Sequence, residues 1–293
     1  MGLPDITVAQ FEYLDAVARH PTWAAAASSL RVSPSALSQG LAELERRLGV
    51  TLFEREGRRR VPTAAHAEVL RHARQVLAQT HDIVAWAEHV RVGQKGRVRL
   101  GMIDVGVVAH FPKVLRRYRA ERPGLEVHLT VASSASLLTE VAGGNLDLVV
   151  CVAPPTSFAG VALTPLWDEN LFVYPTRDAS GDDEPWGPWV TFPAGSHTRT
   201  IVEREVRALR RPFDVVAESN QPEVLREMVR LGLGWTVLPA AQAGIGTARL
   251  AARSGNPLCA RTLVLARRTT AAAIPAVDEL ATLLLATPIT RSE

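Results

Sequence analysis

Cysteine and aromatic residues are scarce in this chain. Two cysteines occur among 293 residues, and Phe, Trp and Tyr together make up 5%. Cys151 and Cys259 lie within apolar, strand-like runs, and neither belongs to a CxxC pair or adjoins a basic residue pair that would depress its pKa. These features exclude a disulfide-rich secreted domain and indicate buried thiols in a reducing compartment. A redox pair is the less favoured alternative.

Long hydrophobic runs are absent as well. No apolar run of about 15 residues follows the first residue, and no stretch of about 18 apolar residues occurs anywhere. This pattern excludes a signal peptide and a membrane span, so we expect a cytoplasmic protein with no membrane partner. The hydrophobic fraction of 47% and the charged fraction of 22% are ordinary for a soluble protein of about two to three domains.

Patterns typical of enzymes, metal sites and cofactor sites are also missing. The eight histidines include no HxxxH pair and no His/Cys cluster, so we expect no metal. The GQKG segment lacks the Ser or Thr that follows a phosphate-binding lysine. Ser196 and His197 are adjacent, but chain neighbours rarely face each other as nucleophile and base, and no GxSxG elbow is present. We therefore expect no enzymatic activity and no cofactor.

The excess of positive charge lies in the N-terminal third of the chain. Residues 1–97 contain 13 Lys and Arg against 10 Asp and Glu, whereas residues 98–293 contain 20 of each kind. The net charge of +3 therefore comes from the N-terminal segment. A nucleic acid contact is expected there.

Residues 23–45, WAAAASSLRVSPSALSQGLAELE, are typical of two short helices joined by a tight turn. Thr22 and Ser33 are suited to cap the two helices, because their hydroxyl groups can accept from unpaired backbone amides. Pro34 fits the first helical position, where its missing N–H would be unpaired anyway. A third helix is predicted upstream, over residues 8–18, from its apolar spacing.

The second helix of this pair has an apolar face and a polar face. Leucines recur along it at spacings of four, three and four: Leu37, Leu41, Leu44 and Leu48. The polar face begins at the helix N-terminus, where hydroxyl groups and the positive end of the helix dipole can meet phosphates and base edges. We predict that this face contacts DNA through Ser33, Pro34, Ser35, Ser38, Gln39 and Arg46. The alternative is a surface helix of a small bundle.

A cluster of arginines follows this helix, in the segment EREGRRR. Gly57 sits where a hairpin tip would, and the arginines around it are Arg55, Arg58, Arg59 and Arg60. Guanidinium groups on a hairpin can reach the DNA backbone or a narrow minor groove, which predicts strongly salt-dependent binding. The alternative is a solvated run of charge.

The motif resembles the N-terminal domain of LysR-type transcriptional regulators. The residues that carry the resemblance are Ala26-Ala27, Leu30, Ser33 to Gln39, Leu44-Glu45, Leu48-Gly49, Leu52 to Arg55 and Thr63. Three positions depart from the family pattern. Gly40 replaces a longer polar residue, which we interpret as thinning the base-reading surface, and Pro62 and His66 replace the usual Leu and Gly after the wing. The resemblance implies a winged helix-turn-helix over residues 1–62.

Residues 63–92 contain neither Pro nor Gly, and their apolar residues alternate at spacings of four and three. This heptad pattern predicts a helix of about 30 residues, roughly 45 Å long, with an apolar stripe that pairing with a second copy would cover. The resemblance implies the same dimerisation, and we expect further assembly into a homotetramer. We predict that the contacts include Val69, Val76, Leu77, Ile83, Val84 and Val90. The alternative is a helix that packs only on its own chain.

The pattern changes after the GQKG break. Strand-like segments alternate with helical ones in two successive units, which predicts parallel α/β sheets. The resemblance implies an α+β multidomain protein whose residues 93–293 form a two-lobed, periplasmic-binding-protein-like effector domain. We assign lobe I to residues of about 97–165 and 267–293, and lobe II to about 166–266.

Candidate effector-binding residues follow the predicted strands, because ligands of open α/β sheets bind outside the carboxyl ends of the strands. They are Asp104, Val105, Ser133, Ser134, Ser136, Ala153, Pro154, Ser196, His197, Thr198, Ser219 and Asn220. Taken alone, each serine is more often a helix cap than a ligand contact, and the same holds narrowly for Asp104; only their convergence on one cleft favours the site. A carboxylate opposite serine-rich helix starts suits a small zwitterion such as an amino acid, while a plain carboxylate remains open.

Two functions fit these features. The first is a LysR-type regulator that binds double-stranded operator DNA under the control of a small-molecule effector. The second is a small-solute-binding protein with no role in transcription. The missing signal peptide favours the regulator, and a mobility-shift assay would separate the two.

Overall fold

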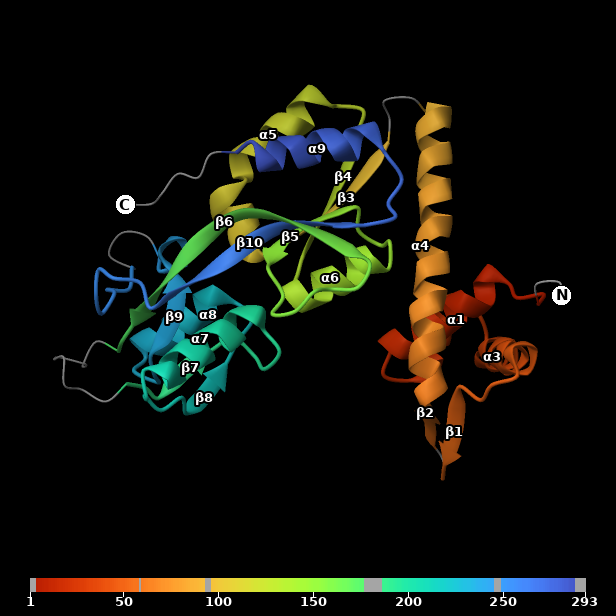
Figure 1. Ribbon diagram of the computed structural model, residues 1–293, viewed down its shortest axis with the longest axis horizontal. Helices are drawn as coiled ribbons and strands as arrows, with labels where there is room; N and C mark the ends of the chain where they lie inside the picture. Colours follow the sequence, from red (N-terminus) through yellow and green to blue (C-terminus); the bar gives the residue numbers. More distant parts are fainter. Residues whose placement is uncertain (1–3, 58, 93–95, 177–185, 245–248, 288–293) are drawn as a thin grey trace.

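The computed structural model describes residues 4–57, 59–92, 96–176, 186–244 and 249–287. Three parts follow one another along the chain (Figure 1). Most of an N-terminal head of short helices and a hairpin lies on one side of a long helix, and a larger α/β domain lies on its other side. Arg58 lies outside the described residues, as does the side chain of Val90.

The head contains three helices and a two-stranded hairpin. They are α1 (Val8–Arg19), α2 (Trp23–Ser29), α3 (Pro34–Leu48), β1 (Phe53–Glu56) and β2 (Arg59–Pro62). The predicted caps are confirmed: Thr22 Oγ1 accepts from the Ala25 amide at 3.1 Å, and Ser33 Oγ from the Ala36 amide at 3.1 Å. The predicted leucines, Leu37, Leu41 and Leu44, are fully buried in the core of the head.

The long helix α4 (Ala64–Val92) has one face against its own chain. Leu70 and Ala73 complete the core of the head, and Val69 packs beside them. Leu77 is also buried, at 6% exposure. The structure therefore corrects the predicted dimer contacts: Val69 packs on the core of the head, and Leu77, seven positions after Leu70 and four after Ala73, lies on the same buried face of α4, so both face this chain rather than a partner.

Lobe I has helices on both faces of a sheet. Its elements are β3 (Arg97–Met102), the π-helix η1 (Gly106–His110), α5 (Pro112–Glu121), β4 (Glu126–Val131), α6 (Ser134–Ala142), β5 (Leu148–Val152) and α9 (Pro275–Leu285). Strand β3 runs parallel to both β4 and β5. Helices α5 and α9 cover one face, and α6 covers the face toward α4 (Figure 1).

Lobe II contains shorter strands. Its elements are β7 (Trp189–Thr191), α7 (His197–Ala208), β8 (Val215–Glu218), α8 (Pro222–Arg230), β9 (Thr236–Pro239) and the 3-10 helix η2 (Ala240–Gln242). Strands β7 and β8 are parallel. Trp189 and Trp235 lie in its core, with ring centroids 6.3 Å apart.

Two long antiparallel strands, β6 (Val161–Tyr174) and β10 (Cys259–Arg268), connect the lobes. They belong to one sheet in the order β4-β3-β5-β10-β6-β9. Only the last part of β6, LFVY, is an apolar, strand-like run in the sequence. Its first part contains Pro165, Asp168 and Glu169, so the apolar alternation that marks a strand is weak there. The proposed lobe boundaries at 166 and 266 fall inside these two strands.

Lobe I approaches α4 closely. Gly144 has φ +74°, and a Cβ built on it would lie 2.7 Å from Cα of Ala78 in α4. Arg268 of β10 pairs with Asp82 of α4, and Arg19 of α1 lies 3.6 Å from a carboxylate oxygen of Glu140. No helix within the described ranges is long and apolar enough to cross a membrane.

Candidate functional site

The polar face predicted to contact DNA is exposed at the start of α3. Ser33, Pro34, Ser35 and Gln39 are exposed, and Ser38 is half-buried. The Oγ atoms of Ser33 and Ser35 are 2.9 Å apart. Since Ser33 also caps the helix, its hydroxyl group holds the helix start in place while the side chains of the next turn point outward.

The hairpin lies against the same helix start. Arg60 of β2 donates to Ser38 Oγ at 3.2 Å, and its guanidinium group lies 4.4 Å from the ring centroid of Trp23. Arg55 and Arg59 are exposed on the two strands. The hairpin and the first turn of α3 therefore form one continuous surface that carries both hydroxyl groups and guanidinium groups.

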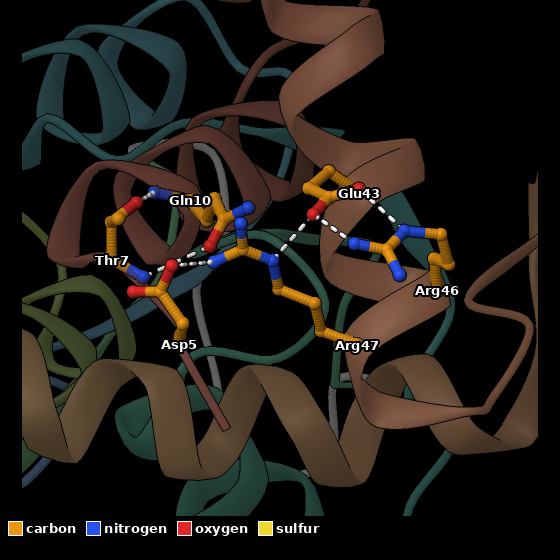
Figure 2. Close-up of polar contacts among 6 residues, drawn as sticks. All are labelled: Asp5, Thr7, Gln10, Glu43, Arg46 and Arg47. Atoms are coloured by element: carbon orange, nitrogen blue, oxygen red, sulfur yellow. Dashed lines mark hydrogen bonds and ion pairs between the residues drawn. The ribbon is translucent and has the colours of Figure 1, made fainter. Parts of the chain in front are cut away.

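Arg46 has a partner within its own helix. Figure 2 shows Glu43 accepting from both Arg46 and Arg47, while Arg47 also reaches Asp5 at 3.2 Å. Hydrogen bonds from Arg46 and Arg47 lower the pKa of Glu43 to about 2. This cluster connects the end of α3 to the segment before α1, and Arg46 remains 70% exposed while its Nε and Nη2 pair with Glu43.

Gly40 does not belong to the DNA-facing surface. A Cβ at this position would lie 2.6 Å from ring atoms of Tyr13 in α1. The interpretation that Gly40 thins the base-reading surface is therefore wrong. Glycine at this position instead permits α1 and α3 to approach closely, because any side chain would displace Tyr13.

In the effector domain, most of the predicted serines are bonded to backbone. Ser133 Oγ accepts from the Ser136 amide at 3.4 Å and caps α6, and Ser196 Oγ accepts from the Arg199 amide at 3.5 Å and caps α7. Ser219 Oγ accepts from the Gln221 amide at 3.0 Å. The interpretation of these serines as caps, which the sequence left open, is confirmed for Ser133 and Ser196.

The end of β5 brings the two lobes together. Ser134 Oγ accepts from the Val152 amide at 3.1 Å, and Nδ1 of His197 lies 3.1 Å from the carbonyl oxygen of the same residue. Ala153 and Pro154 follow directly and are half-buried. The starts of α6 and α7 therefore meet at the carboxyl end of β5. Ser136 is exposed and Asn220 lies near the start of α8.

Asp104 follows β3, which runs parallel to β5 beside it. Its Oδ2 atom accepts from Nε2 of Gln242 in lobe II at 2.6 Å. Burial raises the pKa of Asp104, although Arg261 acts in the opposite direction. Val105 is a correction to the predicted set: its side chain is 1% exposed and packs in the core of lobe I, so it cannot present a side chain to a ligand.

A buried polar network that the sequence did not reveal lies beneath these residues. Arg261 of β10 donates to Glu169 Oε2 at 2.8 Å and to Thr198 Oγ1 at 2.8 Å. Nε2 of His110 lies 2.7 Å from Oε1 of Glu169. Burial raises the pKa of Glu169, but Arg261 and His110 outweigh it, so this pKa lies below its ordinary value. The sequence held one signal of this network: Arg261 itself, a charged residue inside the apolar run LCARTLVLA. Such residues are rarely buried unless they are paired.

We define the interlobe site as Asp104, Ser134, His197, Thr198, Gln242 and Arg261. Its members come from both lobes and from the strands that connect them. Of these, Gln242 and Arg261 were not predicted, because neither follows one of the strands from which candidates were taken. Among the described residues, no group of three or more His, Cys, Asp or Glu side chains is arranged to hold a metal ion.

The two thiols are unsuited to form a disulfide with each other. Cys151 pairs with Val264 of β10, and Cys259 lies five positions away along that strand, a separation of about 16 Å. A disulfide requires Cα atoms within about 7 Å. Burial raises the pKa of Cys151 to about 12 and that of Cys259 to about 11, so both thiols stay protonated near neutral pH.

Known domains match both parts of the chain. Residues 8–65 match "Bacterial regulatory helix-turn-helix protein, lysR family", and residues 91–288 match "LysR substrate binding domain". The probable hydrogen peroxide-inducible genes activator of Streptomyces viridosporus is 31% identical over 95% of this chain and 93% of its own length.

Solved structures share the fold. A full-length OxyR variant from Pseudomonas aeruginosa has a TM-score of 0.63 at 23% identity, with 98% of this chain and 100% of that chain covered. Full-length CbnR complexed with its target DNA has a TM-score of 0.59 at 20% identity, with 95% of this chain and 98% of that chain covered.

The chain belongs to the LysR family of DNA-binding transcriptional regulators. Its fold is the predicted winged helix-turn-helix followed by a long helix and a two-lobed effector domain. Members of the family are regulators rather than enzymes, and they bind DNA and small-molecule effectors and form oligomers. The regulator function is thus confirmed over the solute-binding alternative.

Proposed function

We propose that residues 1–62 bind operator DNA, that residues 63–92 pair two subunits, and that residues 93–293 bind the effector. For DNA binding, the support is the continuous surface formed by the start of α3 and the hairpin. Ser35, Ser38 and Gln39 would contact base edges, while Arg55, Arg59 and Arg60 would contact the backbone. Arg46, whose side chain is 70% exposed beside Glu43, would also contact the backbone.

The proposed dimer uses the face of α4 that its own chain leaves uncovered. Val76, Ile83, Val84 and Trp86 are exposed there, at 38%, 67%, 52% and 55%. An apolar stripe of this length on a helix is stabilised by burial against a second copy. Two such dimers would form the homotetramer.

The proposed effector is a small zwitterion such as an amino acid. Two observations support this proposal: Asp104 accepts from Gln242 of lobe II, and the serine-capped N-termini of α6 and α7 meet at the end of β5. Burial raises the pKa of Asp104, so a nearby ammonium group would stabilise its ionised form. A helix N-terminus, in contrast, stabilises an anion. A zwitterion offers one group to each, and a plain carboxylate would be repelled by Asp104.

A thermal-shift screen of the full-length protein tests this proposal. Amino acids are compared with carboxylic acids of the same carbon skeleton that lack the amine. A ligand at about 100 times its dissociation constant should stabilise the protein by roughly 2.7 kcal/mol. We expect amino acids to give the shift, Asp104→Asn to abolish it, and Asp278→Asn, which changes a carboxylate on α9 outside the interlobe site, to leave it intact.

Two results would contradict the zwitterion proposal. One is a shift with plain carboxylates but not with amino acids. The other is an amino-acid response that Asp104→Asn leaves unchanged. Neither result affects the family assignment, which rests on the whole chain.

A further inference from the structure

The carboxylate of Asp104 already has a hydrogen-bond donor within the chain. Nε2 of Gln242 donates to Oδ2 of Asp104 at 2.6 Å. Asp104 follows β3 of lobe I, whereas Gln242 belongs to η2 of lobe II, 138 positions later. This hydrogen bond therefore joins the two lobes directly, at the carboxylate that the proposed effector would use for its ammonium group.

Gln242 is held in place by its own lobe. The residue is 6% exposed, and its carbonyl oxygen accepts from Nη1 of Arg226 in α8 at 3.0 Å. The next residue, Ala243, is fully buried in a core cluster of lobe II, and its amide donates to the carbonyl oxygen of Ala240 at 3.1 Å. Because the backbone of η2 is fixed in this way, rotation of the Gln242 side chain is the simplest movement that takes its amide group away from Asp104.

The side-chain amide of Gln242 has one polar partner among the described residues. Its Oε1 atom is buried and accepts no hydrogen bond from them. A buried acceptor without a partner is unfavourable, so the bond from Nε2 to Asp104 is the polar contact that stabilises this position of the side chain. If Asp104 accepts from another donor, Gln242 loses this contact and its present orientation is no longer stabilised.

An ammonium group is a stronger partner for Asp104 than the Gln242 amide is. Both groups donate N–H hydrogen bonds, but the ammonium is charged and the amide is neutral, so only the ammonium adds coulombic attraction to the carboxylate. Asp104 is half-buried, whereas Gln242 is buried, so the carboxylate keeps more exposed surface than its present partner. Replacement of the amide by an ammonium is therefore favourable at Asp104 and breaks the hydrogen bond between the lobes.

We propose that Gln242 is an internal competitor of the effector: its side-chain amide occupies Asp104 until the ammonium group of an amino acid replaces it. This inference rests on the proposed amino-acid effector and extends it in two ways. Gln242 lowers the affinity for the effector, because only molecules in which Asp104 is free bind it. Binding also exchanges a hydrogen bond between the lobes for a contact with the ligand, so the effector loosens this connection.

Calorimetric titration of the full-length protein with L-amino acids and their amine-free counterparts, such as alanine and propanoate, tests the competition. For the amino acid that binds most tightly, Gln242→Ala should raise the affinity at least about tenfold, as the loss of a competing hydrogen bond to a charged group predicts. Gln242→Met, which keeps the length of the side chain without the amide, should also raise it. Binding of the amine-free acid should change less than about twofold, because this acid has no donor for Asp104.

Arg226→Met is the matched control. It removes the hydrogen bond to the carbonyl oxygen of Gln242 but leaves the side-chain amide of Gln242 unchanged. We expect the affinity for the amino acid to change less than about threefold. If Arg226→Met raised the affinity as much as Gln242→Ala does, a looser η2 would explain the gain and the competition would be wrong.

A side-chain signal reports the replacement directly. In nitrogen NMR spectra of the full-length protein, the resonance that disappears in Gln242→Ala identifies the Gln242 amide. Its hydrogens should exchange with solvent faster when the amino acid is bound. If the amino acid binds while this amide stays as protected as before, the bond to Asp104 persists and the proposal is overturned.

The outcomes separate this inference from the proposed effector class. Amino-acid binding that both Gln242 variants leave unchanged or weaken contradicts the competition but keeps the effector class. No amino-acid binding by the wild type or by either Gln242 variant contradicts both. Binding that is measurable only in the Gln242 variants supports both, because the internal amide then outcompetes the ligand in the wild type.

Discussion

The head and the effector domain position their polar side chains in different ways. Ser35 and Gln39 lie about one turn apart on α3, so a single helix sets their arrangement. In the interlobe site, Thr198 and Arg261 are 63 positions apart and both buried. Their relative position depends on how the two lobes pack and on β6 and β10, the antiparallel strands that connect them. We therefore expect substitutions in the head to change binding alone, and substitutions in the interlobe network to change stability as well.

The largest effect is expected for Arg261→Met. It leaves the carboxylate of Glu169 buried with only His110 as a partner, and removing one member of a buried ion pair costs about 3–5 kcal/mol. Urea unfolding of the full-length protein measures this loss. Arg267→Met, which removes a half-exposed pair with Asp278, should cost about 0–1 kcal/mol.

Two further measurements sharpen this prediction. The double variant Arg261→Met, Glu169→Leu should recover much of the lost stability, because no buried charge is then left unpaired.

The pKa of Glu169 is lower in the folded state than in the unfolded state, so its stabilisation is present above the unfolded pKa and is lost as the pH falls through the folded pKa. If Arg261→Met and Arg267→Met lowered the free energy of unfolding by the same amount, the buried network around Arg261 would not be a main source of stability.

Ile83→Asp should give the next largest effect, and on assembly alone. Because Ile83 is 67% exposed in one chain, the subunit should fold, whereas a dimer would bury two aspartates without partners. We expect the dimer dissociation constant to rise at least about 100-fold, or about 3 kcal/mol. Sedimentation is the measurement, and Ala67→Asp, on the opposite face of α4, is the control. An unchanged assembly would show that α4 is not the main contact.

Gln39→Ala should affect sequence preference without affecting the fold. An amide that pairs with an adenine edge contributes about 1–3 kcal/mol of discrimination at one base pair. Selection from a randomised operator library, with wild-type protein as the reference, measures this preference. If the preferred sequence stays the same, the recognition surface lies elsewhere on α3.

Arg59→Ala should have the smallest effect. A wing arginine on the DNA backbone would weaken binding similarly for all sequences and reduce the slope of log affinity against log salt by about 1. The same is predicted for Arg58→Ala, at a position outside the described residues. Binding titrations at several salt concentrations test this, with Arg119→Ala on α5 as an exposed control. A loss confined to one base position would mean that Arg59 reads sequence.

The head was predictable in detail because its signals are local. Helix caps and leucine spacing each depend on residues within about four positions, and the structure confirms them. Gly40 was misinterpreted because its neighbour in space, Tyr13, lies on another helix. Val69 and Leu77 were misassigned for a similar reason: apolar spacing identifies a stripe on α4, but not which part of it the same chain covers.

The sequence by itself determined the family, the order of the three parts and the alternation of strands and helices in each lobe, because periodicity and capping act over short distances along the chain. Only the tertiary structure decided that β6 extends back to Val161, that Gln242 bonds Asp104, and that Arg261 lies between Glu169 and Thr198. These contacts join residues 63 to 138 positions apart. Burial makes such polar pairs obligatory, yet burial is a property of the packed lobes rather than of any local sequence.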